Sequence, residues 1–491
     1  MELRTSTLNR LPPEVARPNY DRRALTVGIV HIGVGGFHRS HQAMYLDRLM
    51  AAGGARDWAI CGAGVLSSDL PLADALRRQD GLYTLVTKPA QGPWRAQVIG
   101  SIIDYRHAVG DAERLLQCLT APAVRIVSLT ITEGGYNFDE QTRQFRYDQP
   151  AIARDLAGQT PLATVFGLVT EACRRRREGG IGGFTLLSCD NLPANGDTAR
   201  MMFLAFAGRR DRATAGWMAG QVTFPNSMVD RITPVTTAAD RLAVCRQFGI
   251  DDACPVVCEP YAQWVLEDRF AAGRPALEKV GVQLVGDVAP YELMKLRLLN
   301  GCHQALAYLG CLHGYRFVHE VAHDPVFEEF GLGYMAREVC STLLPVPGVD
   351  LGEYQRGLLD RFGNPEIQDS LARICEQTSD RIPKWILPVI RRRLEMGLPV
   401  THGAMVIASW ARYALGFDER GNEFAVIDRR ALEVQAMARR AQTEPLEFIR
   451  HRPIFGDLAE CRPFAAAYLQ AARCLGERGA RAAADACRPA R

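Results

Sequence analysis

The spacing of apolar residues along the chain changes once, near residue 285, and this change constrains the fold most. Before it, short apolar runs rich in β-branched residues alternate with helical patterns; these runs lie at 25–33, 58–65, 82–88, 96–105, 124–132 and 184–192. From Tyr291 onward the spacing is almost wholly helical. Continuous apolar strands separated by helices predict a parallel sheet covered on both faces. We therefore expect an α/β domain over 1–285 and a mainly helical domain over 286–491.

Length and charge exclude several classes of protein. The chain has 491 residues, beyond the usual size of one hydrophobic core, so two domains are expected. A net charge of +3 is too small to indicate a nucleic-acid partner or an anionic membrane surface. No apolar run reaches the roughly 18 residues of a spanning helix, and the first residues lack the apolar segment of a signal peptide.

The cysteines indicate the compartment. The 14 cysteines are scattered singly, mostly inside apolar stretches, as buried thiols are in a reducing environment. We expect a cytoplasmic protein, either a monomer or a weak homo-oligomer. The run of four arginines at 174–177 precedes Glu-Gly-Gly, and we expect a solvated cap that matches the dipole of a helix end.

A glycine turn follows the first apolar run. Strand 25–33 leads directly into Gly-Val-Gly-Gly-Phe-His-Arg at 33–39 and then into a helix. Such a turn lets phosphates approach the backbone at a helix N-terminus, as in the dinucleotide site of a Rossmann-type, doubly wound sheet. The third glycine of that pattern is replaced by His38, and a tight structural turn would also use glycines here. Asp69, just after the second run, suits the ribose hydroxyls of NAD and would repel the phosphate of NADP, although a solvated loop aspartate is an equal alternative.

A second cluster of polar residues lies on an otherwise apolar helical stretch. With Lys295 at zero and about 100° per residue, Glu292 falls near 60°, His303 near 80° and Asn300 near 140°. A lysine on a buried helix is unfavourable unless it has a role, and burial lowers its pKa from about 10.4 towards the 7–8 of a general base. Glu292, one turn earlier, is positioned to relay the proton to solvent. The alternative is a lysine that extends to the surface beside a core histidine.

Two further segments combine polarity with strand ends. Asn191 lies in Ser-Cys-Asp-Asn-Leu-Pro at the carboxyl end of an expected strand, where ligands bind in such sheets. A turn-forming asparagine before Leu-Pro is the competing interpretation. Asn226, Asp230 and Arg231 lie close together within 224–234, and a salt-bridged loop would also explain them.

Together these segments resemble the mannitol dehydrogenase family, the polyol-specific long-chain dehydrogenases. GVGGFHRSHQAMYLD (33–47) resembles its phosphate loop, in which histidine characteristically replaces the third glycine. VTFPNSMVDRITP (222–234) matches the family signature, and KLRLLNGCHQALAYLG (295–310) resembles its catalytic helix. The three matches come in the family's order, and the landmarks of the resemblance extend from residue 33 to about 385, over most of the chain.

The resemblance implies a zinc-independent, NAD-dependent oxidation of mannitol at C2 to fructose, with the polyol bound between the two domains. Arabinitol, sorbitol and hexuronate or altronate acids are alternative substrates. By motif, Lys295 is the implied general base, and Asn191 and Asn300 donate to the reacting oxygen. His303, on the same helix, is implied to bind the polyol hydroxyls, while the relay role of Glu292 is expected from its position one turn before Lys295. Asp230, Arg373 and Arg381 are the implied substrate ligands. The implied cofactor residues are Gly33, Val34, Gly35, Gly36, Phe37, His38 and Asp69, and no metal is implied.

One pattern points to a different class of enzyme. His319-Glu320-Val321-Ala322-His323 is a literal H-E-x-x-H, as in zinc proteases. Asp324-Pro325 follows at once, so the helix must end almost at the second histidine. We expect packing or surface roles for these residues. A third class, a non-catalytic sugar-binding protein, is disfavoured because Lys295 and Asn300 are both present.

Overall fold

The apolar run at 25–33 forms β1 (Val27–Ile32), the central strand of a five-stranded parallel sheet. The order is β5-β2-β1-β6-β7, with β2 (Ala59–Gly64), β5 (Ile102–His107), β6 (Ile126–Leu129) and β7 (Thr185–Ser188). Because the chain crosses over after β5 to build β6 on the other side of β1, the sheet is doubly wound. The Rossmann-type fold expected from the sequence is confirmed.

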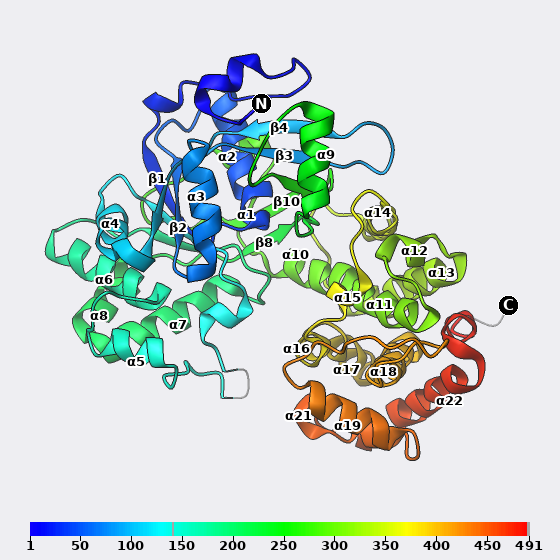
Figure 1. Cartoon of the computed structure of the whole chain (residues 1–491). Helices are drawn as coiled ribbons and strands as arrows, with labels where there is room; N and C mark the ends of the chain where they lie inside the picture. Colours follow the sequence, from blue (N-terminus) through cyan, green and yellow to red (C-terminus); the bar gives the residue numbers. More distant parts are fainter. Residues whose placement is uncertain (140–141, 489–491) are drawn as a thin grey trace. The chain divides into compact units, whose positions relative to one another are not determined.

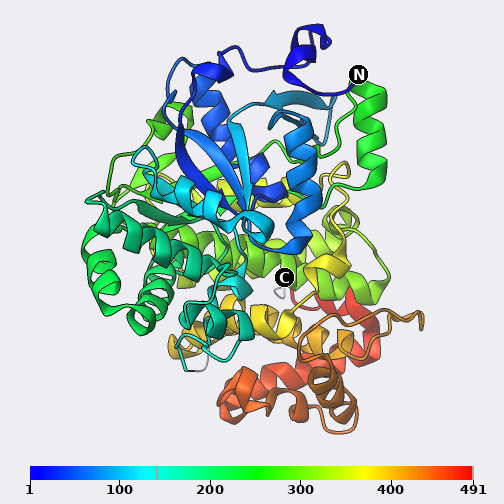
Figure 2. The same ribbon diagram turned by 60° about the vertical axis from the view of Figure 1, so that its left-hand side comes forward.

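The structure describes residues 1–139 and 142–488, and the chain forms two compact units, Met1–Ala289 and Pro290–Arg491. Figures 1 and 2 show strands and helices in the first unit and helices alone from α10 onward. Each unit is described by itself.

Helices cover both faces of the parallel sheet. Ile29 packs on one face with α2 (Gln42–Ala51) and α3 (Leu70–Arg78). Val30 and Ile32 point to the other face, since alternate strand residues face opposite ways. The other helices of this unit are α1 (Gly36–Ser40), α4 (Ala108–Thr120), α5 (Pro150–Leu156), α6 (Val165–Glu178), α7 (Asn195–Arg210), α8 (Arg212–Gln221) and α9 (Ala238–Phe248).

Two of the expected strands do not join the parallel sheet as predicted. The run at 82–88 forms β3 (Tyr83–Thr87), which pairs antiparallel with β4 (Arg95–Ile99) and parallel with β9 (Val256–Cys258). The run at 96–105 was expected to be one strand, but it divides at Gly100 into β4 and β5. The Gly100 N–H donates to the buried Asp47 carboxylate at 2.8 Å, and a Cβ there would lie 2.7 Å from Pro18. The chain therefore turns at this position.

A third sheet completes the first unit. Strand β10 (Gln263–Glu267) pairs antiparallel with β8 (Ser227–Asp230) and parallel with β11 (Gln283–Val285). Short 3-10 turns lie at η1 (Thr5–Arg10), η2 (Arg22–Ala24), η3 (Ser67–Asp69), η4 (Glu133–Tyr136) and η5 (Leu277–Val280).

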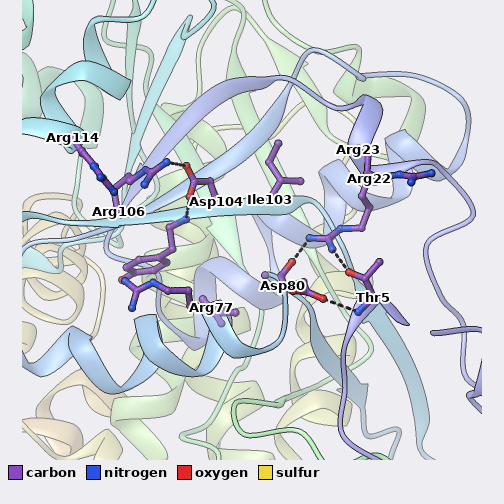
Figure 3. Close-up of a pocket in the computed structure, with 12 residues that line it drawn as sticks. Thr5, Arg22, Arg23, Arg77, Asp80, Ile103, Asp104, Arg106 and Arg114 are labelled. Carbon is purple, nitrogen blue, oxygen red and sulfur yellow. Dashed lines mark hydrogen bonds and ion pairs between the residues drawn. The ribbon is translucent and has the colours of Figure 1, made fainter. Parts of the chain in front are cut away.

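The edge strand β5 is covered by polar side chains. Arg22 donates to the Ile102 carbonyl at 2.8 Å. It also donates to the Asp80 carbonyl at 2.6 Å, and Asp104 accepts the Tyr105 N–H at 2.8 Å (Figure 3). Arg106 also pairs with Asp104 at 2.7 Å. These residues line a cavity of about 630 Å³. Because charged side chains occupy the free backbone groups, the edge is protected from pairing with another strand.

The second unit is built around the buried helix α11 (Gly301–His313), which packs against α18 (Thr401–Tyr413) and α22 (Arg462–Asp485). Gly314, with φ +93°, ends α11. The other elements are α10 (Ala289–Met294), η6 (Lys295–Asn300), α12 (Val318–His323), α13 (Pro325–Gly333), η7 (Tyr334–Val339), η8 (Cys340–Thr342), α14 (Leu351–Phe362), α15 (Leu371–Ile374), α16 (Thr378–Trp385), α17 (Leu387–Glu395), α19 (Ala431–Ala441), α20 (Leu446–Ile449), α21 (Arg452–Phe455) and η9 (Leu458–Glu460). Among the described residues, no helix is long and apolar enough to cross a membrane.

The four arginines at 174–177 are not all a solvated cap, as the sequence suggested. Arg176 is 1% exposed, and its guanidinium donates to the carbonyls of Gly182 at 2.8 Å and of Leu119 and Ala121 at 3.1 Å each. Arg174 instead forms partly exposed ion pairs on the same helix. The prediction was wrong for Arg176 because three carbonyls at chain turns need a buried donor.

We predict that Arg176→Met lowers the free energy of unfolding of the first unit by about 3 kcal/mol, since it leaves buried carbonyls without donors. The matched control, Arg174→Met, removes partly exposed ion pairs and leaves Glu171 bonded to Arg175, so it is expected to change the free energy of unfolding by less than about 1 kcal/mol. Urea unfolding followed by circular dichroism measures both. Equal losses of unfolding free energy in the two variants would show that the hydrogen bonds of Arg176 to the three carbonyls add no stability beyond that of the Arg174 ion pairs.

Candidate active site

The glycine turn after β1 uses its glycines for two different reasons. Gly33 has φ +92°, and a Cβ there would lie 2.1 Å from the Thr130 carbonyl oxygen, so the fold itself requires glycine. At Gly35 the backbone is extended, and the nearest atom to an added Cβ is 3.9 Å away. The fold leaves that space open, in front of the N–H groups that begin α1. A glycine with free space before a helix N-terminus fits the close approach of a dinucleotide pyrophosphate.

His38 takes the place of the third glycine by stacking. Its ring lies flat on His31 of β1, with centroids 3.4 Å apart and 15° between the planes. His31 is held by the Ser128 hydroxyl at 2.8 Å. Burial lowers the pKa of His31 to about 3, and burial together with the neighbouring His31 lowers the pKa of His38 well below its ordinary value. The pair is therefore neutral, and it joins α1 to β1 without the close helix–strand contact that glycine provides.

Asp69 ends a 3-10 turn at the carboxyl end of β2. Its Oδ2 accepts the N–H groups of Val65 and Leu66 at 3.1 and 3.0 Å. The side chain is half-buried. Asp69 follows β2, the strand next to β1, which is where a Rossmann-type sheet carries the carboxylate that binds the ribose.

Asn191 lies between two fixed points of the chain. It follows β7, and a short loop leads from it to Asn195 at the start of α7. The Asn195 side chain donates to the carbonyls of Asp190 at 3.0 Å and Ser227 at 2.8 Å, and it accepts the Ser227 N–H at 3.0 Å. Asn191 itself is half-buried.

The segment at 224–234 holds this loop and the cofactor helix together. Asn226 Oδ1 accepts the N–H groups of Gly196 and Asp197 at 2.9 and 3.1 Å and so caps α7. Arg231, 6% exposed, donates to the Ser40 carbonyl of α1 at 2.6 Å. Asp230, between them in sequence, is also buried, at the end of β8. The segment therefore connects α7, β8 and α1 through the side chains of Asn226 and Arg231.

Lys295 and Asn300 lie on a π-helical turn. Both are 6% exposed, and the Gly301 N–H donates to the Leu296 carbonyl, five residues back. The phases predicted from the sequence assumed 3.6 residues per turn, and for η6 that assumption is wrong. In an α-helix, the fifth residue lies about 140° away around the axis, whereas i→i+5 bonding brings it towards the same face. The π-turn therefore aligns Lys295 with Asn300 better than an α-helix would.

The wider turn is accommodated where Gly301 meets a second π-turn, η7. A Cβ on Gly301 would lie 3.2 Å from the Tyr334 hydroxyl oxygen and 3.5 Å from its ring. Burial raises the pKa of Tyr334 well above its ordinary value, and its hydroxyl has no hydrogen-bond partner among the described residues.

The residues that flank the π-turn belong to the same continuous helical stretch. Glu292 is half-buried in α10, directly before η6, and His303 lies in α11, directly after it. The His303 ring is 8% exposed and stacks on Phe362 of α14, with centroids 3.9 Å apart. The second unit thus brings Glu292, Lys295, Asn300 and His303 onto one helical axis.

The two arginines of the second unit are linked through α15. Arg373 makes a two-bond ion pair with Asp369, at 2.7 and 2.5 Å, and its side chain is 43% exposed. Arg381 donates to the carbonyls of Arg373 at 3.4 Å and Ile374 at 2.9 Å. Gln304 of α11 also binds the Ile374 carbonyl, at 2.5 Å. Arg381 thus fixes the end of α15 that carries Arg373.

The H-E-x-x-H stretch has a structural role. Helix α12 ends at His323, as the following Asp-Pro predicted, and Asp324 caps α13 by accepting the Val326 N–H at 2.9 Å. Glu320 accepts the N–H groups of Arg316 and Phe317, at 2.7 and 2.8 Å. Its carboxylate caps α12 rather than facing a metal-bound water. In residues 1–139 and 142–488, no cluster of three or more histidine, cysteine or acidic side chains could hold a metal ion.

The fold and these sites define a Rossmann-type dinucleotide-binding unit followed by a helical unit with a buried lysine–asparagine pair. The mannitol dehydrogenase Rossmann domain matches residues 27–279, and the mannitol dehydrogenase C-terminal domain matches residues 287–475. The chain therefore belongs to the mannitol dehydrogenase family.

Individual relatives extend along nearly the whole chain. A mannitol 2-dehydrogenase of Pyrenophora tritici-repentis is 44% identical over 93% of this chain and 81% of its own length. Among solved structures, the Pseudomonas fluorescens mannitol 2-dehydrogenase in ternary complex with NAD and D-mannitol matches with a TM-score of 0.91 at 45% identity, covering 99% of both chains. A D-sorbitol dehydrogenase in substrate-free form matches with a TM-score of 0.90 at 37% identity, covering 98% of this chain and all of its own.

We predict that Gly301→Ala lowers the free energy of unfolding of the second unit by about 1–2 kcal/mol, because the added methyl group overpacks against Tyr334. Tyr334→Phe removes the nearest atom, an unpartnered buried hydroxyl, and should relieve most of that loss in the double variant. Urea unfolding of the two single variants and the double variant measures the coupling. Additive effects of the two substitutions would exclude this contact as the reason for glycine at 301.

Proposed function

We propose that the chain oxidises D-mannitol at C2 to D-fructose with NAD, and catalyses the reverse reaction, with Lys295 as general base. Family membership makes the chain an NAD-dependent polyol dehydrogenase. The choice of mannitol as substrate is supported by the similarity over 99% of both chains to the enzyme solved with NAD and D-mannitol. In this proposal residues 1–285 hold the cofactor and residues 286–491 provide the general base.

The residues of the first unit fit the cofactor. Gly33, Val34, Gly35, Gly36, Phe37 and His38 form the turn and the start of α1 proposed to hold the pyrophosphate. Asp69 retains an oxygen, Oδ1, for the ribose hydroxyls, because its own loop uses Oδ2. When bound, NAD accepts the hydride from the carbinol carbon. The carboxylate of Asp69 is expected to disfavour the extra phosphate of NADP by charge repulsion.

The burial of Lys295 supports its proposed role as general base. With 6% of its surface exposed, desolvation favours the neutral amine, which is the form that accepts a proton. The Lys295 Nζ takes the hydroxyl proton as the hydride leaves the same carbon, so the alcohol loses one proton and one hydride and becomes a ketone. Glu292, half-buried one turn earlier, is proposed to pass the proton on to solvent.

The amides are proposed to stabilise the oxygen as its negative charge develops. The Asn300 Nδ2 is buried and has no hydrogen-bond partner among the described residues, so a donor is available on the same side of η6 as Lys295. Asn191 of the first unit is proposed as a second donor. His303, Asp230 and Arg373 are proposed to bind the other hydroxyls of the polyol, and Arg381 to hold Arg373 in place.

A second substrate is favoured by one observation. The similarity to a D-sorbitol dehydrogenase is nearly as extensive, with a TM-score of 0.90. Sorbitol differs from mannitol only in the configuration of one carbinol centre, so the same base and amides could serve it.

All fourteen cysteines are free thiols, which supports the proposed cytoplasmic location. We further propose a monomer or weak homo-oligomer.

We predict that Lys295→Ala lowers kcat for mannitol oxidation about a thousandfold, because general-base catalysis contributes on that order. In the unaltered protein, oxidation should accelerate with rising pH as Lys295 loses its proton, and fructose reduction should slow; the variant should lack both dependences. NADH absorbance measures the rates. Lys279→Ala, which removes an exposed lysine, is the matched control. Turnover of Lys295→Ala close to that of the control would refute the assignment.

We predict that mannitol gives the highest kcat/KM in a panel with sorbitol, D-arabinitol and altronate, each tested with NAD and NADP. The family resemblance and the mannitol complex both favour this order. Initial rates of cofactor reduction measure it. Preference for altronate would replace the polyol with a sugar acid, while preference for sorbitol would support the second substrate.

A further inference from the structure

A buried carboxylate lies directly beside Asn191. Asp190 is 5% exposed and lies two residues beyond Ser188, the last residue of β7. Its Oδ2 accepts the Ile131 N–H at 3.0 Å and the Tyr136 hydroxyl at 2.7 Å, and its Oδ1 accepts the Thr132 N–H at 2.8 Å. Three donors from the loop after β6 therefore converge on one side chain from the loop after β7.

The loop that Asp190 binds is strained. Thr132 has φ +61°, in the left-handed region that a β-branched residue rarely adopts. Such a conformation persists only where the surroundings impose it. The two backbone N–H groups of Ile131 and Thr132 each bond to an oxygen of Asp190, so the carboxylate supplies that restraint.

The same loop forms one wall of the cofactor turn. The Thr130 N–H donates to the Ile32 carbonyl at 3.0 Å, and the Thr130 carbonyl oxygen would lie 2.1 Å from a Cβ on Gly33. The Ile131 side chain is the next group along, at 3.6 Å from that position. A shift of this loop would therefore move the atoms that define the shape of the turn at Gly33.

The main chain of Asp190 is fixed from the other side. Its carbonyl accepts the Asn195 side chain at 3.0 Å, and Asn195 is bonded in turn to Ser227. Ala194, just before Asn195, is also left-handed, with φ +46°. Asn191 therefore lies in a short loop that begins at Asp190 and ends at Asn195, and the Asn195 side chain bonds the Asp190 carbonyl oxygen.

We propose that Asp190 is a positioning residue that sets two parts of the site at once. Its carboxylate fixes the 130–132 loop against Gly33 for the cofactor, and its main chain fixes Asn191 for the reacting oxygen. The inference rests on the proposed function, because Asn191 is an oxygen donor only in that reaction.

The arrangement has a pH dependence. Burial raises the pKa of Asp190 to about 6. The hydrogen bonds from its three donors lower this pKa, and the nearby negative charge of Glu133 raises it. The other titratable groups facing it, Tyr136 and Cys189, have pKa values raised by burial and remain neutral. Below about pH 6 the carboxyl gains a proton and can no longer accept from all three donors. Fructose reduction, which needs protonated Lys295, should therefore decline on the acid side of pH 6.

The test compares Asp190→Asn, Tyr136→Phe and the exposed control Asp148→Asn. Asparagine cannot accept from the Ile131 and Thr132 N–H groups at both positions, so Asp190→Asn should weaken NADH binding and lower kcat by about ten- to a hundredfold each. It should also abolish the acid limb of fructose reduction. Tyr136→Phe removes one donor to the carboxylate and should move that limb to higher pH. NADH fluorescence titration and initial rates measure these effects.

Several results would overturn the proposal. Asp190→Asn with NADH affinity and kcat within twofold of the control, but with lower thermal stability, would leave Asp190 a purely structural residue. An acid limb unmoved in Tyr136→Phe would do the same, and this variant serves if Asp190→Asn does not fold. Absence of fructose reduction in the unaltered protein would refute the proposed function instead. NADH titration of the variants would then still decide whether Asp190 shapes the cofactor turn.

Discussion

The hydrogen bonds of the segment 226–233 are the constraint on which the candidate site of the first unit depends. Asn226 caps α7 and so fixes the far end of the Asn191 loop. A few residues on, Arg231 donates to the Ser40 carbonyl, and the Thr233 hydroxyl bonds the Ser40 hydroxyl at 2.8 Å. One short stretch thereby joins the Asn191 loop to α1.

Several parts of the fold and of the candidate site could be predicted from the sequence, because each depends on residues that are close together in the chain. The strand before Gly33, the glycine turn and the apolar helix around Lys295 each have a characteristic spacing, and the Asp-Pro after His323 marks a helix end. These features depend on residues close together in the chain. The resemblance to the family then implied roles for Asp230 and Arg373, which no local pattern indicates.

The features that were missed depend on distant contacts. The π-turn at 295–300 was not predicted from its own residues, and Gly301, which follows it, packs against Tyr334, more than thirty residues away in the chain. Arg176 looks like its neighbours in sequence but meets carbonyls from two other turns. Asp190 lies in the sequence beside Asn191, yet its partners lie at 131–136. Strand partners were missed for the same reason: β3 pairs with β4 and β9.

Gly33 and Gly35, two of the glycines in the turn after β1, differ in the space around them. At Gly33 any side chain would collide with the protein's own backbone, so a substitution there would be eliminated by misfolding. At Gly35 the protein has room for a methyl group, so an alanine would be tolerated by the folded chain and removed by selection only where the cofactor must bind. A descendant that abandoned dinucleotide chemistry would therefore retain the first glycine and be free to lose the second. If Gly35 faces the cofactor as proposed, the residue at position 35 would distinguish family members that still bind a dinucleotide from those that do not.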